Sequence, residues 1–302
     1  MTDVLKTTHP AQGRVSGDGI ELAFGYWPGR GAPLVALHGL TASYVSFTGI
    51  AECLAGRRPL FALDLRGRGD SDKPAGPYGM AQHASDVAAA MRAMGLGASV
   101  IVGHSMGAFV ATALAAQYPE LVSGLVLLDG GYAPAISAPN SQQGLDAALA
   151  LRIAQLRQAY PSREAYRQFW RTQPHFPPED WSPWVEAFLD YEIGGEAPEL
   201  RPKAAEDEVK ADLIEGLQSE QIAARLRSIH VPVLMLRAPA GFVPGQPPLF
   251  PDAMIEKMRE FVPAMKDQII PGTTHYTLVM GRRGASKIAD LVDDFANLCH
   301  SS

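Results

Sequence analysis

Residues 100–111 read Val-Ile-Val-Gly-His-Ser-Met-Gly-Ala-Phe-Val-Ala, and this stretch decides how the rest of the chain is interpreted. An apolar run typical of a buried strand ends at Gly103, and an Ala-rich run typical of a helix starts after Gly107. A serine hydroxyl can stand at the top of a strand only on a cramped turn, where side chains at positions 103 and 107 would collide with the backbone. We therefore expect Ser105 to be a nucleophile between a strand and a helix, whose N-terminal N–H groups stabilise an anion formed there.

The overall composition is that of an acidic globular protein. Its 302 residues are 47% apolar, which suits one large domain or a core with an inserted subdomain. The net charge of -6 makes nucleic acid and anionic membranes poor partners. The first residues lack the apolar stretch of a signal peptide, no apolar run could span a bilayer, and Cys53 and Cys299 are the only cysteines. We expect a cytoplasmic protein with reduced thiols.

Strand-like and helix-like segments alternate on both sides of a long central interruption. Residues 14–16 and 20–26 flank Gly17-Asp18-Gly19, a hairpin turn signal. Apolar runs without clear alternation occupy residues 33–38, 59–64, 99–103, 122–129, 231–237 and 265–270. Helix-like segments occupy residues 44–54, 80–94, 105–118, 220–229, 251–261 and 285–299. This order predicts an α/β fold with a mostly parallel twisted sheet that helices flank on both faces.

The interruption contains no strand-like run. It is typical of four helices separated by breaks that contain proline or glycine, over residues 144–159, 162–172, 179–192 and 203–217. The sequence thus predicts two parts. Residues 1–132 and 219–302 form a core, and residues 133–218 form a helical insertion.

Several polar residues stand just after the predicted strands. His38, Asp64, Ser105 and Asp129 each end or follow such a run, and His275 lies in the loop after the last strand. Ligands of parallel sheets with helices on both faces bind beyond the carboxyl ends of the strands. These residues are therefore expected to meet at one edge of the sheet.

His275 is the best candidate for the base that a weak serine nucleophile needs. Its loop precedes the last predicted helix. His230 begins a strand at the opposite end of the sheet, and the side chain of His104 is expected to point away from its neighbour Ser105. The remaining candidates lie in the leader, at a helix start, among prolines or near the C-terminus: His9, His83, His175 and His300.

In its motifs the chain resembles the α/β-hydrolase fold family of serine hydrolases. The matching pieces, in the family's order, are His38-Gly39, Asp64-Leu65-Arg66-Gly67-Arg68-Gly69-Asp70-Ser71, Gly103-His104-Ser105-Met106-Gly107 and His275. The resemblance implies that the backbone N–H groups of Leu40 and Met106 form an oxyanion hole and that the helical interruption caps the site. One N–H donor aimed at a developing alkoxide is typically worth about 3 kcal/mol.

The acid that orients His275 has two candidates. Many family members carry it after the strand equivalent to residues 231–237, but residues 238–243 contain no carboxylate. The first carboxylate after them, Asp252, directly precedes a helix, where an acidic residue also favours the helix dipole. Asp129 ends the preceding strand, an arrangement that resembles haloalkane dehalogenases and the lactonases that open zearalenone. We predict Asp129 as the acid and keep Asp252 as the alternative.

An aromatic-rich cap favours a lipophilic substrate. We predict that Tyr132, Trp184 and Phe242 contact this substrate. Most other aromatics are expected to hold the small cap together: Phe169, Trp170, Phe176, Trp181, Phe188 and Tyr191. No motif indicates a metal or a cofactor, because no His-Glu-x-x-His set is present and Gly67-Arg68-Gly69 lacks the third glycine of a dinucleotide site.

These features predict a serine hydrolase that cleaves a carboxylic ester or lactone of a lipophilic or aromatic substrate through an acyl-enzyme. A zearalenone-type macrolactone is one such substrate. The same triad is compatible with carbon–carbon bond hydrolysis, perhydrolysis or acyl transfer. Outside enzymes, the alternative is a ligand receptor that keeps the pocket without turnover. The sequence leaves homo-oligomerisation open.

Overall fold

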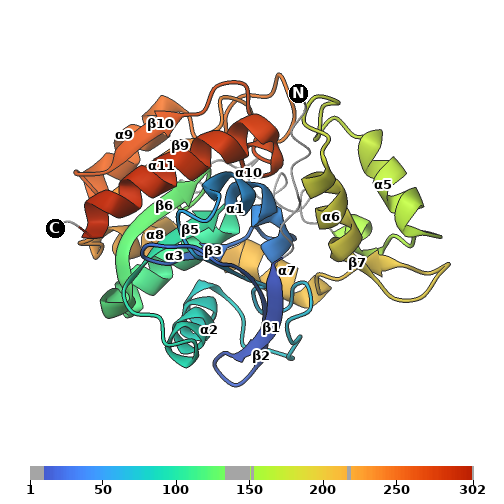
Figure 1. The fold of residues 1–302 in the computed structure, drawn as a ribbon, viewed down its shortest axis with the longest axis horizontal. Coiled ribbons are helices and arrows are strands. Elements are labelled where there is room, and N and C mark those ends of the chain that lie inside the picture. The colour runs from blue at the N-terminus through green and yellow to red at the C-terminus, as the bar shows by residue number, and fades with distance from the viewer. Residues whose placement is uncertain (1–9, 133–149, 151–152, 216–218, 301–302) are drawn as a thin grey trace.

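The computed structural model describes residues 10–132, 150, 153–215 and 219–300 (Figure 1). Its centre is an eight-stranded sheet with the order β1-β2-β4-β3-β5-β6-β9-β10. β2 pairs antiparallel with β1 and β4, whereas the neighbours from β4 to β10 pair in parallel. The strands are Ala11–Ser16 (β1), Glu21–Trp27 (β2), Leu34–Leu37 (β3), Leu60–Leu63 (β4), Ser99–His104 (β5), Val122–Leu128 (β6), Val233–Arg237 (β9) and Lys266–Ile269 (β10). The predicted mostly parallel α/β architecture is confirmed.

Helices cover both faces of this sheet (Figure 1). One face packs against α1 (Thr48–Leu54), α10 (Thr277–Met280) and α11 (Arg282–His300). The other packs against α2 (Met80–Ala93), α3 (Met106–Gln117), α8 (Ser219–Arg227) and α9 (Asp252–Phe261). Val100 and Val102 of β5 enter the first core, and Ile101 enters the second. Both faces of the strand are therefore apolar, which explains the missing alternation in the sequence.

The carboxyl ends of the central strands meet at one edge of the sheet. In the parallel register, Leu37 of β3 lies beside both Leu63 of β4 and Gly103 of β5. His104 at the end of β5 lies beside Leu128 at the end of β6. The residues that follow these strands, His38, Asp64, Ser105 and Asp129, thus leave the sheet at the same edge.

The segment predicted as a cap contains α5 (Arg163–Arg171), α6 (Pro183–Glu192) and α7 (Glu206–Glu215). They occupy three of the four predicted helical stretches, and half of the fourth, residues 144–159, lies outside the described residues. The segment also holds one antiparallel pair, β7 (Ile193–Gly194) with β8 (Arg201–Pro202), which was not expected. Strands of two residues are too short to leave a hydrophobic pattern. The division into core and cap stays a prediction.

The C-terminal end of α6 is hydrogen-bonded to a residue at the carboxyl ends of the sheet strands. The hydroxyl of Tyr191 donates to Asp64 Oδ2 over 2.6 Å, and Glu192 is buried next to it. Burial raises the pKa of Asp64 to about 6, although Tyr191 and two backbone N–H groups donate to this carboxylate. Burial also raises the pKa of Glu192 to about 8, and the charge of Asp64 adds to that effect. The junction of α6 with the sheet therefore holds a carboxyl group that is protonated at neutral pH.

Replacing Glu192 with Gln should remove a pH dependence of stability. The folded protein keeps the proton of Glu192 up to about pH 8, whereas an ordinary glutamic acid releases it near 4.5. Since the folded state binds more protons in this window, the free energy of unfolding of the wild type falls as pH rises through it. The midpoint of thermal unfolding of Glu192→Gln should therefore gain at least about 3 °C on the wild type between about pH 5 and about pH 8.

Glu196→Gln, at an exposed glutamate a few residues away, is the matched control and should follow the wild-type profile. Parallel wild-type and Glu192→Gln profiles would contradict the assignment of a buried proton to Glu192.

Candidate active site

Ser105 sits on a strained turn between β5 and α3. Its φ of 53° and ψ of −118° lie in a region that residues with a side chain rarely adopt. Its N–H donates to Leu128 O over 2.9 Å, and its carbonyl accepts from Ala108 N over 3.1 Å. Ser105 is half-buried. The turn thus places a partly accessible hydroxyl at the edge where the strands end.

The glycines of the motif are sterically required, as expected. A Cβ at Gly103 would lie 2.4 Å from the carbonyl oxygen of Gly107. A Cβ at Gly107 would lie 2.0 Å from the carbonyl oxygen of Leu37 at the end of β3. A third glycine, Gly130, was not singled out from the sequence, and its Cβ would lie 2.2 Å from the carbonyl oxygen of Ser105. The backbone at the ends of β3, β5 and β6 is therefore closely packed around Ser105, with no space for a side chain at these three glycines.

His275 and Asp129 are hydrogen-bonded to each other. His275 Nδ1 lies 2.7 Å from Asp129 Oδ2, and both side chains are buried. The second oxygen of Asp129 accepts from the N–H of Ala238 over 3.2 Å. The N–H of His275 donates to the carbonyl of Gly241 over 2.9 Å. Because a carboxylate accepts, Nδ1 is the donor in this hydrogen bond, and Nε2 is the ring nitrogen that can take up a proton.

Asp252 lies in a different environment. Its carboxylate forms an ion pair with Arg237 Nη2 over 2.6 Å, and its side chain is 81% exposed. It begins α9, where a negative charge also interacts favourably with the helix dipole. Of the two carboxylates considered, the structure brings Asp129 to His275 and places Asp252 on the surface.

His104 supports the loop of His275, a contact that sequence reasoning missed. Its ring packs against the ring of His275 with centroids 4.7 Å apart, and its Nε2 lies 3.0 Å from the carbonyl oxygen of His275. Burial, together with the nearby His275, lowers the pKa of His104 well below its usual range. His104 is therefore a neutral donor that fixes the backbone of His275. Its place inside the Gly-x-Ser-x-Gly motif was the available signal.

The loop after β3 orients the N–H of Leu40. His38 Nε2 accepts from Leu65 N over 2.9 Å, so Nδ1 carries the proton and donates to the carbonyl of Gly39 over 2.7 Å. Ala42 N donates to the same carbonyl. Burial lowers the pKa of His38 to about 3, which keeps the ring neutral. Because the peptide unit is planar and trans, holding the carbonyl of Gly39 also sets the opposite direction of the Leu40 N–H.

Met106 and Gly39 border the same turn. Met106 is the first residue of α3, so its N–H has no acceptor within the helix. A Cβ built on Gly39 would lie 3.7 Å from Ser105 Oγ, which shows how near this loop comes to the hydroxyl. The N–H groups of Leu40 and Met106 thus belong to the two backbone segments that flank Ser105.

The three predicted substrate contacts lie in different places. The ring of Phe242 is 5.0 Å from the ring of His275 and is 36% exposed. Tyr132 is buried against Phe261 of α9. The indole N–H of Trp184 donates to Glu52 of α1 over 2.8 Å. Phe242 is thus the one of the three that the described contacts bring to His275.

Most aromatic rings of the predicted cap pack against one another. Tyr160 packs edge-on against Tyr166 and Phe169, and Phe176 packs against Trp170 and Trp181. From this cluster, Phe176 also reaches Tyr276, whose ring is 5.7 Å from that of His275. A continuous series of ring contacts therefore connects His275 with the segment predicted as a cap.

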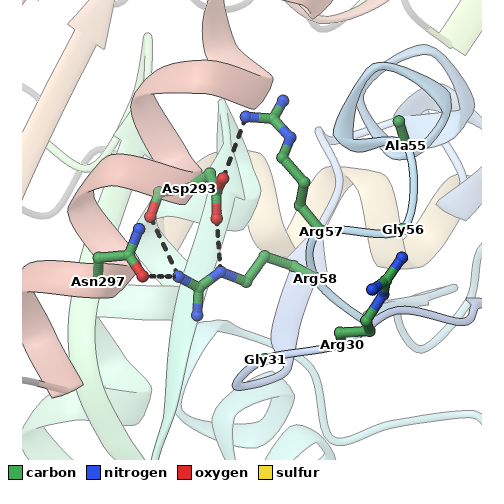
Figure 2. Close-up of a pocket in the computed structure, with 8 residues that line it drawn as sticks. All are labelled: Arg30, Gly31, Ala55, Gly56, Arg57, Arg58, Asp293 and Asn297. Carbon is green, nitrogen blue, oxygen red and sulfur yellow. Dashed lines mark hydrogen bonds and ion pairs between the residues drawn. The ribbon is translucent and has the colours of Figure 1, made fainter.

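The described residues also form two open surface cavities. The one in Figure 2, of about 390 Å³, lies beside Arg30, Arg57 and Arg58, and its other lining residues include Asp293 and Asn297. Figure 2 shows the guanidinium groups of Arg57 and Arg58 directed at Asp293. The second cavity, of about 580 Å³, lies beside β7 and β8. Neither is lined by Ser105, Asp129 or His275.

Two kinds of site or segment are absent from the described part of the chain. No group of three or more His, Cys, Asp or Glu side chains there is placed to hold a metal ion. No helix among those residues is long and apolar enough to cross a membrane.

Comparison with known proteins identifies the class. A family model described as alpha/beta hydrolase fold matches residues 32–281. The chain is 30% identical over 251 residues to 2-(acetamidomethylene)succinate hydrolase of Mesorhizobium japonicum, covering 82% of this chain and 83% of that protein. It is 34% identical over 158 residues to N-formylmaleamate deformylase of Pseudomonas putida, covering 52% of each. The chain belongs to the α/β hydrolase fold family, and it is a hydrolase.

A solved structure agrees with this assignment. The crystal structure of E-2-(acetamidomethylene)succinate hydrolase superposes with a TM-score of 0.80 at 24% identity, covering 96% of this chain and all of that one. At this identity the match shows the shared fold alone.

The packing around Ser105 predicts that the loss of stability on replacing a glycine with alanine depends strongly on the position of that glycine. Gly107→Ala should lower the free energy of unfolding by at least about 2 kcal/mol, because its Cβ meets backbone that cannot move away. Gly97→Ala places the same methyl group where no atom lies within 4 Å and should change stability by less than about 0.5 kcal/mol. Urea unfolding of both variants measures the difference, and equal effects would contradict the close approach of β3 to α3.

Proposed function

We propose that this hydrolase cleaves a carboxylic ester or lactone through an acyl-enzyme formed on Ser105. The observation that carries the proposal is the hydrogen bond of 2.7 Å between His275 Nδ1 and Asp129 Oδ2, at the sheet edge where Ser105 occupies a strained turn. A base oriented by a carboxylate beside a serine on such a turn is the arrangement that activates a hydroxyl for acyl transfer.

Acylation would begin at the hydroxyl. Ser105 Oγ attacks the carbonyl carbon of the substrate while His275 Nε2 takes the hydroxyl proton. Asp129 keeps the proton of His275 on Nδ1 and stabilises the imidazolium that forms. The N–H groups of Leu40 and Met106 donate to the oxyanion of the tetrahedral intermediate. The intermediate collapses when His275 gives its proton to the leaving alkoxide.

Deacylation would follow the same path with water. His275 takes a proton from water, the hydroxide adds to the ester carbonyl of the acyl-enzyme, and the oxyanion is held by the same two N–H groups. Breaking the bond to Ser105 Oγ releases the carboxylic acid, and His275 returns the proton to the serine. No other reactant is needed, because water supplies both the hydroxyl group and the proton of the products.

A lipophilic group in the substrate is supported by the rings next to His275. Phe242 and Tyr276 both pack against the imidazole, and Phe242 remains partly exposed. Apolar rings beside a reacting carbonyl favour an aryl or alkyl substituent over a sugar or a phosphate. A zearalenone-type macrolactone remains one proposed member of this class, on the basis of the Asp129 position and these rings. Contacts of Tyr132 and Trp184 with the substrate remain predictions.

A second candidate function is hydrolysis of an N-acyl bond. The compounds after which the two relatives are named carry an acetamido group and an N-formyl group. In both groups a carbonyl carbon is bonded to nitrogen. The same residues would serve this reaction, with His275 protonating a leaving nitrogen instead of an alkoxide.

Replacing the two carboxylates should separate their roles. Asp129→Asn should lower kcat by about 10³–10⁴-fold, because an amide no longer holds the proton of His275 on Nδ1. Asp252→Asn should leave kcat within about twofold, since its carboxylate pairs with Arg237 at the surface. Steady-state hydrolysis of a 4-nitrophenyl ester measures both, with Ser105→Ala as the inactive control. Loss of turnover in Asp252→Asn alone would assign the acid to Asp252.

Matched substrates should decide between the two bond types. We expect 4-nitrophenyl acetate and lactones of increasing ring size to be hydrolysed, and 4-nitroacetanilide, which carries the same acetyl group on nitrogen, to react much more slowly. A burst of 4-nitrophenol equal to the enzyme concentration would report the acyl-enzyme. A higher kcat/KM for the anilide would instead select the N-acyl function. A wild-type protein that neither turns over nor reacts with a fluorophosphonate at Ser105 would be a receptor.

A further inference from the structure

One buried guanidinium contacts both residues that are proposed to supply the oxyanion hole. Arg68 Nε donates to the carbonyl of Leu40 over 2.9 Å, and Arg68 Nη2 lies 3.8 Å from Met106 Sδ. Arg68 Nη1 donates to the carbonyl of Arg66 over 2.9 Å. The side chain of Arg68 is fully buried. The proposed reaction gives this arginine no role.

The partner of Arg68 comes from α7, at the end of the segment predicted as a cap. Asp212 Oδ2 lies 2.6 Å from Arg68 Nη1 and 2.8 Å from His83 Nε2. Asp212 Oδ1 accepts from the N–H of Gly79 over 2.8 Å. The carboxylate is also fully buried. The Asp212 carboxylate that pairs with Arg68 is therefore itself held in place by His83 of α2 and by Gly79, which precedes α2.

Arg68 holds the peptide unit that follows Leu40, whereas His38 holds the peptide unit that precedes it. The peptide before Leu40 is held through the carbonyl of Gly39, which accepts from His38 and Ala42. The peptide after Leu40 is held through its own carbonyl, which accepts from Arg68. With both flanking carbonyls bonded, the N–H of Leu40 has one direction. The sulfur of Met106 lies against the same guanidinium, so one side chain contacts both residues.

We propose that Arg68, anchored by Asp212 of α7, is a positioning residue that sets the spacing of the Leu40 and Met106 N–H groups. This inference rests on the proposed acyl-enzyme function, because it assigns a role in stabilising the oxyanion of that reaction.

Stability alone is a poor explanation for this pair. Removing two charges from water is unfavourable, and a buried ion pair often gives no more stability than apolar side chains of similar volume. A guanidinium, by contrast, can bond a carbonyl, a sulfur and a carboxylate at fixed mutual angles, which an ammonium cannot do. We therefore attribute to Arg68 the positioning of the groups that it contacts, and not a gain in stability.

The role has a kinetic signature that a merely structural role lacks. The oxyanion forms only in the transition state and the tetrahedral intermediate, so a displaced N–H affects kcat and leaves substrate binding nearly unchanged. A displacement of about 1 Å can reduce the rate about 100-fold. Affinity for a trifluoromethyl ketone, which forms a tetrahedral adduct with the serine, should fall in parallel with kcat/KM.

The test compares Arg68→Lys with Arg58→Lys. Arg58 is a second buried, ion-paired arginine, bonded to Asp293 on the far side of the sheet from α2 and α3, and Figure 2 shows its environment. We expect Arg68→Lys to lower kcat about 10- to 100-fold with KM changed less than about threefold. Arg58→Lys should keep the wild-type kcat, and thermal unfolding of both variants shows what each loses in stability. Asp212→Asn, which keeps the size of the anchor, should give a smaller loss of kcat in the same direction.

The rate of Ser105 labelling by a fluorophosphonate separates the possible failures, because this reaction also develops charge at the oxyanion. Slower labelling of Arg68→Lys than of wild type and Arg58→Lys supports the inference. Equal labelling and unchanged ketone affinity, with only a lower unfolding midpoint, would reduce Arg68 to a structural residue while the proposed function stands. If wild type is not labelled at Ser105, the proposed function fails and the inference falls with it.

Discussion

The near-contact of three strand ends is the constraint on which the site depends. The backbone of α3 lies against the end of β3 at Gly107, and the chain after β6 lies against Ser105 at Gly130, with no space for a side chain at either point. Hydrogen bonds of the parallel sheet hold these ends together. They also sustain the left-handed backbone of Ser105, which costs about 1–3 kcal/mol. The position of the nucleophile is thus a property of the main chain.

The parts that could be predicted from the sequence are those that local chemistry dictates. Apolar runs and breaks indicated the strands and helices, and the glycine spacing indicated the turn at Ser105, because these patterns express backbone requirements within a few residues. His275 was predicted from its place in the loop after the last strand, whereas Asp129 was predicted from the resemblance to family members that carry the acid at this strand end. For the two candidate acids, the coordinates add the hydrogen bond of Asp129 to His275 and the surface ion pair of Asp252 with Arg237. The catalytic roles of these residues stay predictions that the geometry supports.

The parts that could not be predicted depend on contacts between distant segments. Arg68 and Asp212 are charged residues in polar stretches, and in a sequence such residues look like a solvated surface, yet both are fully buried. His104 looked like a neighbour facing away from Ser105, and its contact with the carbonyl of His275 depends on a loop far along the chain. The indole N–H of Trp184 donates to Glu52 of α1, a contact between segments 132 residues apart that no local pattern indicates. Aromatic content alone does not show which rings face a ligand and which face each other.

The ion pair between Asp212 of α7 and Arg68 determines which parts of the segment between β6 and α8 can be exchanged without losing an internal contact. In the part of the chain that the structure describes, the segment between β6 and α8 supplies no strand to the eight-stranded sheet. α6 reaches the strand ends through the hydrogen bond from Tyr191 to Asp64, and α7 reaches the buried Arg68 through Asp212. A chimaera that borrows the first part of this segment and keeps its own residues 206–215 retains the internal ion pair. One that borrows the whole segment inherits a foreign partner for Arg68.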